Sequence, residues 1–216
     1  MLAAALPLCL WGVQATAQSV LPGSAAKLSS VVTTSEVRAE LLAHAPQGLG
    51  AGRTVWLGLQ IKHQPDWHTY WKNPGDSGLP TTLKWTLPSG VQAGEIAWPT
   101  PKKFPLGELA NYGYEGTVLL PVPLTVAPGF KDEQLSVRLK ASWLVCRREC
   151  IPQEGEFVLN VPARSSYAAQ GAAFEAARQA SPQALAGGSG LATPEDKNVR
   201  VSVTGLPLNM HGKVLE

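Results

Sequence analysis

Ser136-Val-Arg-Leu-Lys-Ala-Ser-Trp143 is the stretch that decides the fold of this chain. Its apolar residues Val137, Leu139 and Ala141 alternate with polar ones, so in an extended strand they share one face. Residues 53–62 repeat this period of two. The apolar residues of that second run are Val55, Leu57, Leu59 and Ile61. Two amphipathic strands of this kind predict a sheet with one buried face.

Shorter β-branched or aromatic runs recur along the chain, separated by Pro, Gly, Asn and Asp. Together the runs predict strands at residues 31–42, 54–62, 81–86, 91–98, 116–122, 134–146 and 155–161. No convincing helical pattern interrupts them. The sequence therefore predicts an all-β fold, an immunoglobulin-like antiparallel β-sandwich.

The pattern changes after Pro162. Residues 165–180 are rich in alanine and predict a short helix that Ser181 and Pro182 end. A flexible linker follows by composition, and then a new strand. The linker, the strand and the start of a further strand fall on residues 185–190, 198–204 and 211–216. We therefore expect a sandwich domain at 28–163, a helix and linker at 164–197, and the start of a truncated second β domain at 198–216.

The N-terminus has the features of a secretory signal peptide at residues 1–17. Residues 1–13 are apolar, and Ala15-Thr16-Ala17 fits the cleavage pattern of small residues. A positively charged start is missing, so a short membrane anchor is the alternative. Cleavage would remove Cys9 and leave two cysteines in a compartment that permits disulfides.

Composition excludes several classes of function. The chain has 216 residues and a formal net charge of +2, and no run of Lys or Arg exceeds two residues. A nucleic-acid-binding protein usually presents a clustered basic face, so we expect no nucleic-acid partner. No stretch of about 20 apolar residues occurs after the signal peptide, so we expect no membrane span in this chain.

The two remaining cysteines lie in Trp143-Leu-Val-Cys146-Arg-Arg-Glu-Cys150-Ile-Pro152. On a straight strand, residues i and i+4 are roughly 13 Å apart, whereas a disulfide needs Cα atoms within about 7 Å. The chain must therefore turn at residues 147–149 if the bond forms. Strand patterns on both sides place the pair at the mouth of a hairpin, near one end of the sandwich.

The chemistry of this pair has three interpretations. A disulfide that closes so short a loop adds little stability, and Arg147 and Arg148 favour a thiolate while Glu149 opposes it, which together favour a redox role. The second interpretation is an inert clip. The third is copper or zinc binding by the thiols, although the four histidines show no ligand spacing to the cysteines.

Two other segments stand out. Residues 66–78 are dense in aromatic residues and end in turn residues, which is typical of a ligand platform or, more often, of core at a strand end. His68 by itself indicates no catalytic role. Residues 98–105 are rich in proline and lead into glycines and aromatics at 106–114, a composition that fits either a loop covering a reactive site or an ordinary surface loop.

Three motifs in this order resemble the N-terminal periplasmic domain of the thiol:disulfide interchange protein DsbD family, most closely its ScsB-like branch, which is linked to copper tolerance. The motifs are Trp67-His-Thr-Tyr-Trp-Lys-Asn-Pro-Gly-Asp-Ser-Gly78, Tyr112-Gly-Tyr-Glu-Gly116 with Leu119-Leu-Pro121, and the segment from Trp143 to Pro152. The resemblance covers about residues 28–162. It implies a domain of a membrane protein-disulfide reductase on the periplasmic side of the bacterial inner membrane.

The resemblance also implies roles and partners. Cys146 and Cys150 would be the exchanging pair, and a cap at about residues 102–114 would shield them through Phe104, Tyr112 and Tyr114. Electrons would come from a membrane domain and a thioredoxin-like domain and pass to periplasmic disulfide proteins, such as isomerases or cytochrome c maturation factors. No cofactor or metal is expected.

This sequence departs from the best-studied members of the family, whose cysteines lie further apart. The spacing leaves open which cysteine attacks. The strand pattern after the linker also favours a second β domain, as in the ScsB-like branch. The alternative function is a non-enzymatic periplasmic β-sandwich that binds copper or a protein partner through the same thiols.

Overall fold

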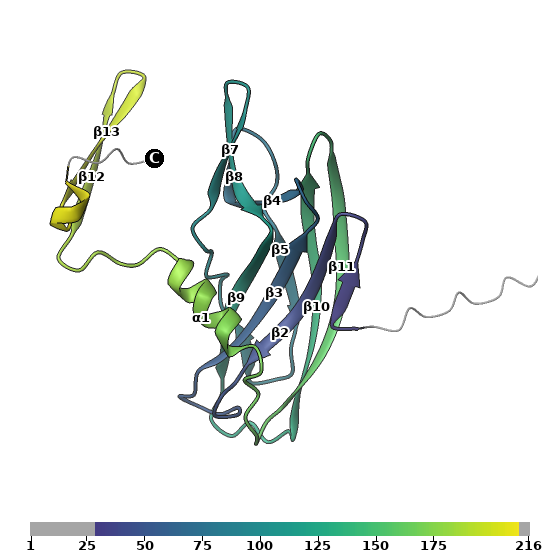
Figure 1. The fold of residues 1–216 in the computed structure, drawn as a ribbon. Coiled ribbons are helices and arrows are strands. Elements are labelled where there is room, and N and C mark those ends of the chain that lie inside the picture. The colour runs from purple at the N-terminus through teal and green to yellow at the C-terminus, as the bar shows by residue number, and fades with distance from the viewer. Residues whose placement is uncertain (1–28, 212–216) are drawn as a thin grey trace, which may run out of the picture.

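The computed structural model describes residues 29–211, and two antiparallel sheets make up most of it (Figure 1). The first sheet has the spatial order β1 (Val31–Thr33), β2 (Val37–His44), β3 (Val55–His63), β9 (Thr117–Val126) and β6 (Val91–Ala93). The second has the order β11 (Cys150–Pro162), β10 (Gln134–Cys146), β4 (His68–Gly75), β8 (Leu109–Glu115) and β7 (Lys102–Leu106), and β5 (Thr82–Thr86) also pairs with β10. The predicted all-β sandwich is confirmed.

The core lies between the two sheets and is built by the predicted faces. On β10, Val137, Leu139 and Ala141 are buried, and the polar residues between them are exposed. The predicted inward residues of β3 are buried in the same way: Val55, Leu57, Leu59 and Ile61. Burial of these alternate positions fixes the register of both strands, because a slip by one residue would turn each apolar face to solvent.

Strand β9 runs four residues beyond its predicted end, even though it contains Pro121 and Pro123. Both prolines turn their backbone polar groups toward residues 94–97, where the N–H groups of Gly94 and Ala97 donate to the carbonyl oxygens of Pro123 and Pro121. These residues do not continue as a regular strand, so the missing proline N–H interrupts no ladder of hydrogen bonds. The predicted strand at 91–98 ends at Ala93, because only residues 91–93 pair in regular register with β9.

Three strands of the second sheet were not predicted. Strand β4 lies within the aromatic segment 66–78, and β7 and β8 form a hairpin where the sequence predicted a loop. Pro105 disguises β7 in the sequence, but β7 is an edge strand, where a missing N–H leaves no partner unsatisfied. Residues 102–114 are therefore an ordered hairpin paired to β4 through β8.

Helix α1 (Gly171–Ala180) confirms the predicted helix, although it begins six residues later. It covers the outer face of the first sheet, where Phe174 and Ala177 pack against Leu42 and Leu119. Gly58 makes this packing possible, because a Cβ there would lie 2.7 Å from the side chain of Leu119 and 3.2 Å from that of Phe174.

After α1, β12 (Ser189–Glu195) and β13 (Asn198–Thr204) form a separate two-stranded sheet, followed by the 3-10 helix η1 (Leu208–Met210). Strand β13 matches the predicted strand, but β12 occupies residues that we expected to be linker. The missed strand has Gly190 and Pro194, and it is recognisable only through its pairing with β13. The expected signal peptide, Cys9 and nearly all of the expected strand at 211–216 lie outside the described residues.

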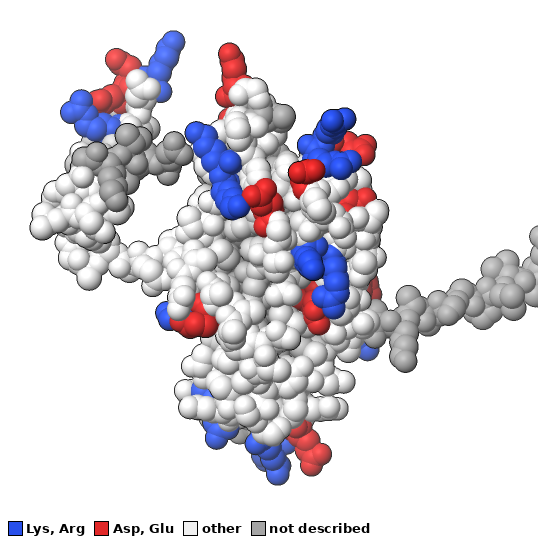
Figure 2. Space-filling model, in the orientation of Figure 1, with Lys and Arg blue, Asp and Glu red and all other residues white. Residues whose placement is uncertain are grey.

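Within residues 29–211, no helix combines the length and the apolar composition that crossing a membrane requires. Figure 2 shows acidic and basic side chains interspersed on one face, with no continuous patch of either sign. Mixed charges of this kind agree with the low net charge of the sequence.

Candidate functional site

Cys146 and Cys150 form a disulfide at the end of the β10–β11 hairpin. The two strands pair in one unbroken register, and its last pair is Cys146 opposite Cys150, with Cα atoms 4.1 Å apart. The chain turns at residues 147–149, where the Arg147 N–H donates to the Glu149 carbonyl (3.0 Å). The predicted turn and hairpin mouth are therefore confirmed.

The two cysteines differ sharply in solvent exposure. Cys146 is only 3% exposed, whereas Cys150 is exposed to solvent. Because Val145 points into the core, Cys146 lies on the outer face of the second sheet and must be covered from outside. A protein approaching this hairpin therefore meets Cys150 first.

Strand β4 supplies two side chains to the disulfide. Its first residue, His68, lies directly opposite Cys146 in the antiparallel register. The hydroxyl group of Tyr70 lies 3.8 Å from Cys150 Sγ, within hydrogen-bonding range of sulfur. Burial raises the pKa of Tyr70 above its ordinary value, so the phenol keeps its proton and can donate it to this sulfur.

The β7–β8 hairpin contributes one aromatic cover. Phe104 stacks on the His68 ring, with centroids 4.7 Å apart, and the rings of Tyr70 and His68 meet edge-to-face with centroids 5.3 Å apart. Of the three cap candidates, Phe104 therefore lies against the site. Tyr114 instead packs in the core and donates its hydroxyl proton to the Pro99 carbonyl (2.7 Å), and Tyr112 is half-buried.

The three residues between the cysteines have different surroundings. Arg147 lies over the ring of Trp67, with its guanidinium carbon 5.1 Å from the ring centroid. Arg148 and Glu149 are exposed. This cation–π contact holds Arg147, one of the two arginines that could stabilise a thiolate, against Trp67, the residue just before β4.

Glu115 lies on the other side of His68, opposite it in the β4–β8 register. Its carboxylate forms an exposed ion pair with Lys102 (2.6 Å). The hydrogen bond and charge of Lys102 lower the pKa of Glu115, so this carboxylate is ionised at neutral pH. Burial lowers the pKa of His68, and the charge of Glu115 opposes that effect.

His63 supports the site from the neighbouring sheet. Its Nδ1 lies 2.9 Å from the Gly116 carbonyl and its Nε2 lies 3.0 Å from Thr69 Oγ1. A carbonyl only accepts, so Nδ1 carries the proton and Nε2 accepts from the threonine hydroxyl. Burial lowers the pKa of His63 to about 4.

This burial predicts an acid-sensitive fold. The unfolded chain takes up a proton near the ordinary histidine pKa, and the folded chain does so only near pH 4, so stability is lost as the pH falls between these values. From pH 7 to 4.5, His63 should contribute a loss of about 2 to 3 kcal/mol. Urea unfolding at both pH values measures it. In His63→Leu the loss should shrink by this amount; an unchanged pH dependence would refute the assignment.

Gly78 explains why the aromatic segment ends in turn residues. The Tyr70 ring packs directly on this glycine, and a Cβ there would lie 2.3 Å from a ring carbon. Its φ of +99° is also a conformation that residues with a side chain rarely adopt. The glycine therefore fixes where the Tyr70 hydroxyl sits relative to Cys150.

Sequence reasoning found the cysteines but missed His68, Tyr70 and Trp67 as site residues. The sequence shows only that these residues lie in a segment, 66–78, that is dense in aromatic side chains. What the sequence did not show is the pairing of β4 with β10, which bridges 78 positions to bring His68 beside Cys146. The available clue was the β-branched and aromatic composition of residues 69–71, which favours a strand.

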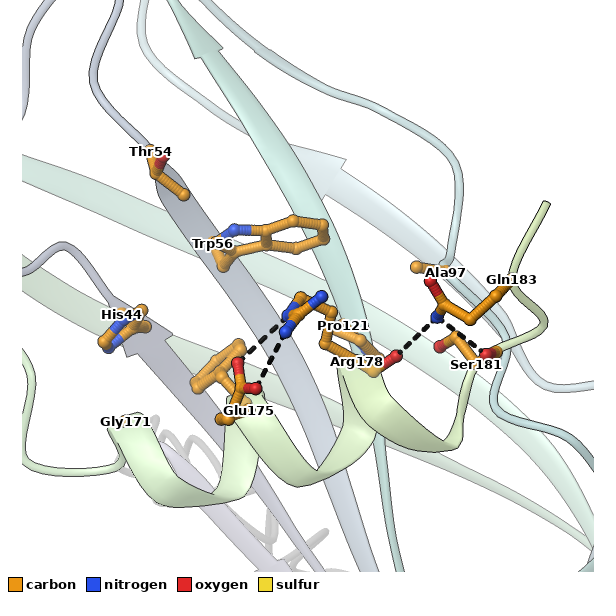
Figure 3. Close-up of a pocket in the computed structure, with 11 residues that line it drawn as sticks. His44, Thr54, Trp56, Ala97, Pro121, Gly171, Glu175, Arg178, Ser181 and Gln183 are labelled. Carbon is orange, nitrogen blue, oxygen red and sulfur yellow. Dashed lines mark hydrogen bonds and ion pairs between the residues drawn. The ribbon is translucent and has the colours of Figure 1, made fainter. Parts of the chain in front are cut away.

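A separate cavity of ≈ 300 Å³ lies between α1 and the first sheet (Figure 3). Trp56 and His44 line it from the strands, and Phe174 from the helix. The Arg178 guanidinium in its wall is already paired with Glu175 through two hydrogen bonds. Neither cysteine lines this cavity, so the disulfide chemistry is located elsewhere. Among the described residues, no three His, Cys, Asp or Glu side chains are grouped as metal ligands.

Comparison with known proteins identifies relatives of this arrangement. Residues 38–162 match a family model described as "Thiol:disulfide interchange protein DsbD, N-terminal". Among solved structures, the chain is similar to the N-terminal periplasmic domain of ScsB from Proteus mirabilis, with a TM-score of 0.53 and 22% identity. The match covers 77% of this chain and 62% of that one, so this chain spans less than two thirds of its length. No curated protein matched the sequence. The immunoglobulin-like sandwich and the family resemblance are both confirmed.

Proposed function

This chain belongs to the family of DsbD N-terminal domains, and from that membership we propose that it exchanges disulfides with protein partners through Cys146 and Cys150. One observation carries the proposal: the disulfide lies at a hairpin tip with one sulfur-bearing residue exposed and the other buried. An exposed sulfur can be attacked by a partner thiolate, and a buried one is protected from a second partner.

The proposed exchange has two steps. The Cys150 thiolate attacks a partner disulfide and forms a mixed disulfide, and Cys146 then attacks Cys150 Sγ and releases the reduced partner. Tyr70 supports this assignment, since its hydroxyl lies beside Cys150 Sγ and can stabilise a thiolate there. Arg147 and Arg148 add positive charge to the same loop.

The cellular setting follows from the family and is also proposed. The domain would act in the periplasm of a bacterium, as part of a membrane protein-disulfide reductase, and relay electrons from a thioredoxin-like domain to periplasmic proteins. Phe104 would act as the removable cover. The exposed valines of β13 support a second β domain after the linker, because a lone hairpin is only marginally stable in water.

Redox titration of the purified chain tests the proposal. The fraction of alkylated thiol at equilibrium with glutathione mixtures should show one reversible two-electron transition between roughly −180 and −270 mV. The Cys146→Ser, Cys150→Ser double variant is the blank. A disulfide that stays closed below about −300 mV would make the pair a structural clip and refute the proposal.

A further inference from the structure

The buried position of Cys146 creates a proton problem. Resolution requires this residue to act as a thiolate, and reduction of the disulfide requires its sulfur to take up a proton. A thiol on a residue that is only 3% exposed ionises with difficulty and has little contact with water. A side chain that can accept and return the proton must therefore lie within reach.

His68 is in the right place. Directly opposite residues of an antiparallel pair have Cβ atoms about 4.5–5.5 Å apart on the same face of the sheet, and Cys146 and His68 are such a pair. The imidazole contacts the rings of both Phe104 and Tyr70, so two ring contacts define its position. We propose that His68 accepts the proton of Cys146 when that thiol attacks, and returns it when the disulfide is reduced.

This proposal rests on the proposed exchange function and balances with it. In the forward direction, the mixed disulfide joins the partner to Cys150. His68 takes the proton of Cys146, the new bond forms between the two cysteine sulfurs, and the partner leaves as a thiolate. In the reverse direction, the thiolate of a reduced dithiol partner attacks Cys150, and the departing Cys146 thiolate receives a proton that the His68 ring has taken up from the solvent. The partner's second thiolate then attacks the partner sulfur of the mixed disulfide, releases the Cys150 thiolate, and leaves as the oxidised partner.

The charged surroundings fit both states of His68. Burial lowers its pKa, so the ring is neutral and able to accept a proton at pH 7. Glu115, opposite it on β8, stabilises the imidazolium once it forms, and Lys102 on β7 keeps that carboxylate ionised. Both ring nitrogens of His63 on β3 are already in hydrogen bonds, with Gly116 and Thr69, and burial lowers its pKa to about 4, so it is a poor proton acceptor. Tyr70 keeps its proton, so it does not compete for the role either.

The test separates the two steps of exchange with glutathione disulfide as the probe. The reduced chain is mixed with the probe, quenched in acid at set times and analysed by mass spectrometry for the glutathione adduct. In His68→Gln and His68→Phe, adduct formation should be unchanged within about twofold. Its decay should slow about 100-fold at pH 7 and recover as the pH rises to about 9.5, where the thiol ionises unaided.

His44→Gln is the matched control, because His44 lies at the end of β2 in the first sheet, where it stacks on Phe174 of helix α1, and its loss should leave both steps unchanged. The second variant, His68→Phe, keeps a ring against Phe104 and so separates proton transfer from packing. Decay at the wild-type rate in both variants, or slowing by the same factor at pH 7 and 9.5, overturns the proposal. If the wild-type chain forms no adduct, the exchange function itself fails.

Discussion

Cys146→Ser is expected to leave a chain that attacks a disulfide once and then stops as a stable mixed disulfide through Cys150. Cys150→Ser should instead fail to react, because the remaining cysteine, Cys146, is buried and lies opposite His68, on which Phe104 stacks. Turnover with a protein disulfide should fall at least about 1,000-fold in both variants, since no other group can replace a missing thiolate in the reaction.

Non-reducing gels and mass spectrometry distinguish the two variants. The Cys146→Ser adduct should persist until a reductant is added, and Cys150→Ser should show none on the same timescale. Circular dichroism of both reduced variants controls for folding. If Cys150→Ser forms the adduct as rapidly as Cys146→Ser, exposure does not decide the attacking residue, and the assigned order of the two steps is wrong.

Gly78→Ala should lower the stability of the fold strongly. A residue forced to a φ near +99° is strained by about 1–3 kcal/mol, and the collision of the new methyl group with the Tyr70 ring adds about 1–3 kcal/mol. We expect a loss of about 4 kcal/mol in the free energy of unfolding. Urea unfolding of the oxidised protein measures it.

Gly129→Ala is a control with nearly the same backbone strain. Its φ is +90°, but nothing lies within 4 Å of an added Cβ, so it should lose only about 1–2 kcal/mol. The difference between the variants reports the contact with Tyr70 alone. Equal losses would show that Tyr70 yields freely and that the glycine does not hold its hydroxyl against Cys150.

The sequence predicted the strands whose two faces differ in polarity, because a buried face imposes a period of two. Strands β3 and β10 are of this kind, and the turn between the cysteines followed from the reach of a disulfide. Strand β4 was not predicted, because its outer face carries His68 and Tyr70 against the disulfide while Trp71 packs against the core. Both faces of the strand therefore hold aromatic side chains. In residues 68–71 every side chain is buried or half-buried, so this part of β4 lacks the alternation of polar and apolar residues that identifies a strand.

The rest of the site depends on contacts between distant segments. The stacking of Phe104 on His68 joins β7 to β4, and Tyr70 reaches Cys150 on β11. No local pattern encodes such pairs. The cap was expected as a loop because Pro105, Gly107 and Gly113 have turn propensity, whereas pairing along the sheet edge overrides that propensity.

The short loop between the cysteines limits how much the stability of the domain changes when the disulfide opens. Strands β10 and β11 are paired along the whole of Gln134–Cys146, so the hairpin is closed whether or not the sulfurs are joined. Opening a bond across four positions returns little chain entropy. Oxidised and reduced forms should therefore differ in free energy of unfolding by only about 2 kcal/mol, less than for a disulfide that closes a longer loop. The domain should therefore stay folded in both states through repeated rounds of electron transfer.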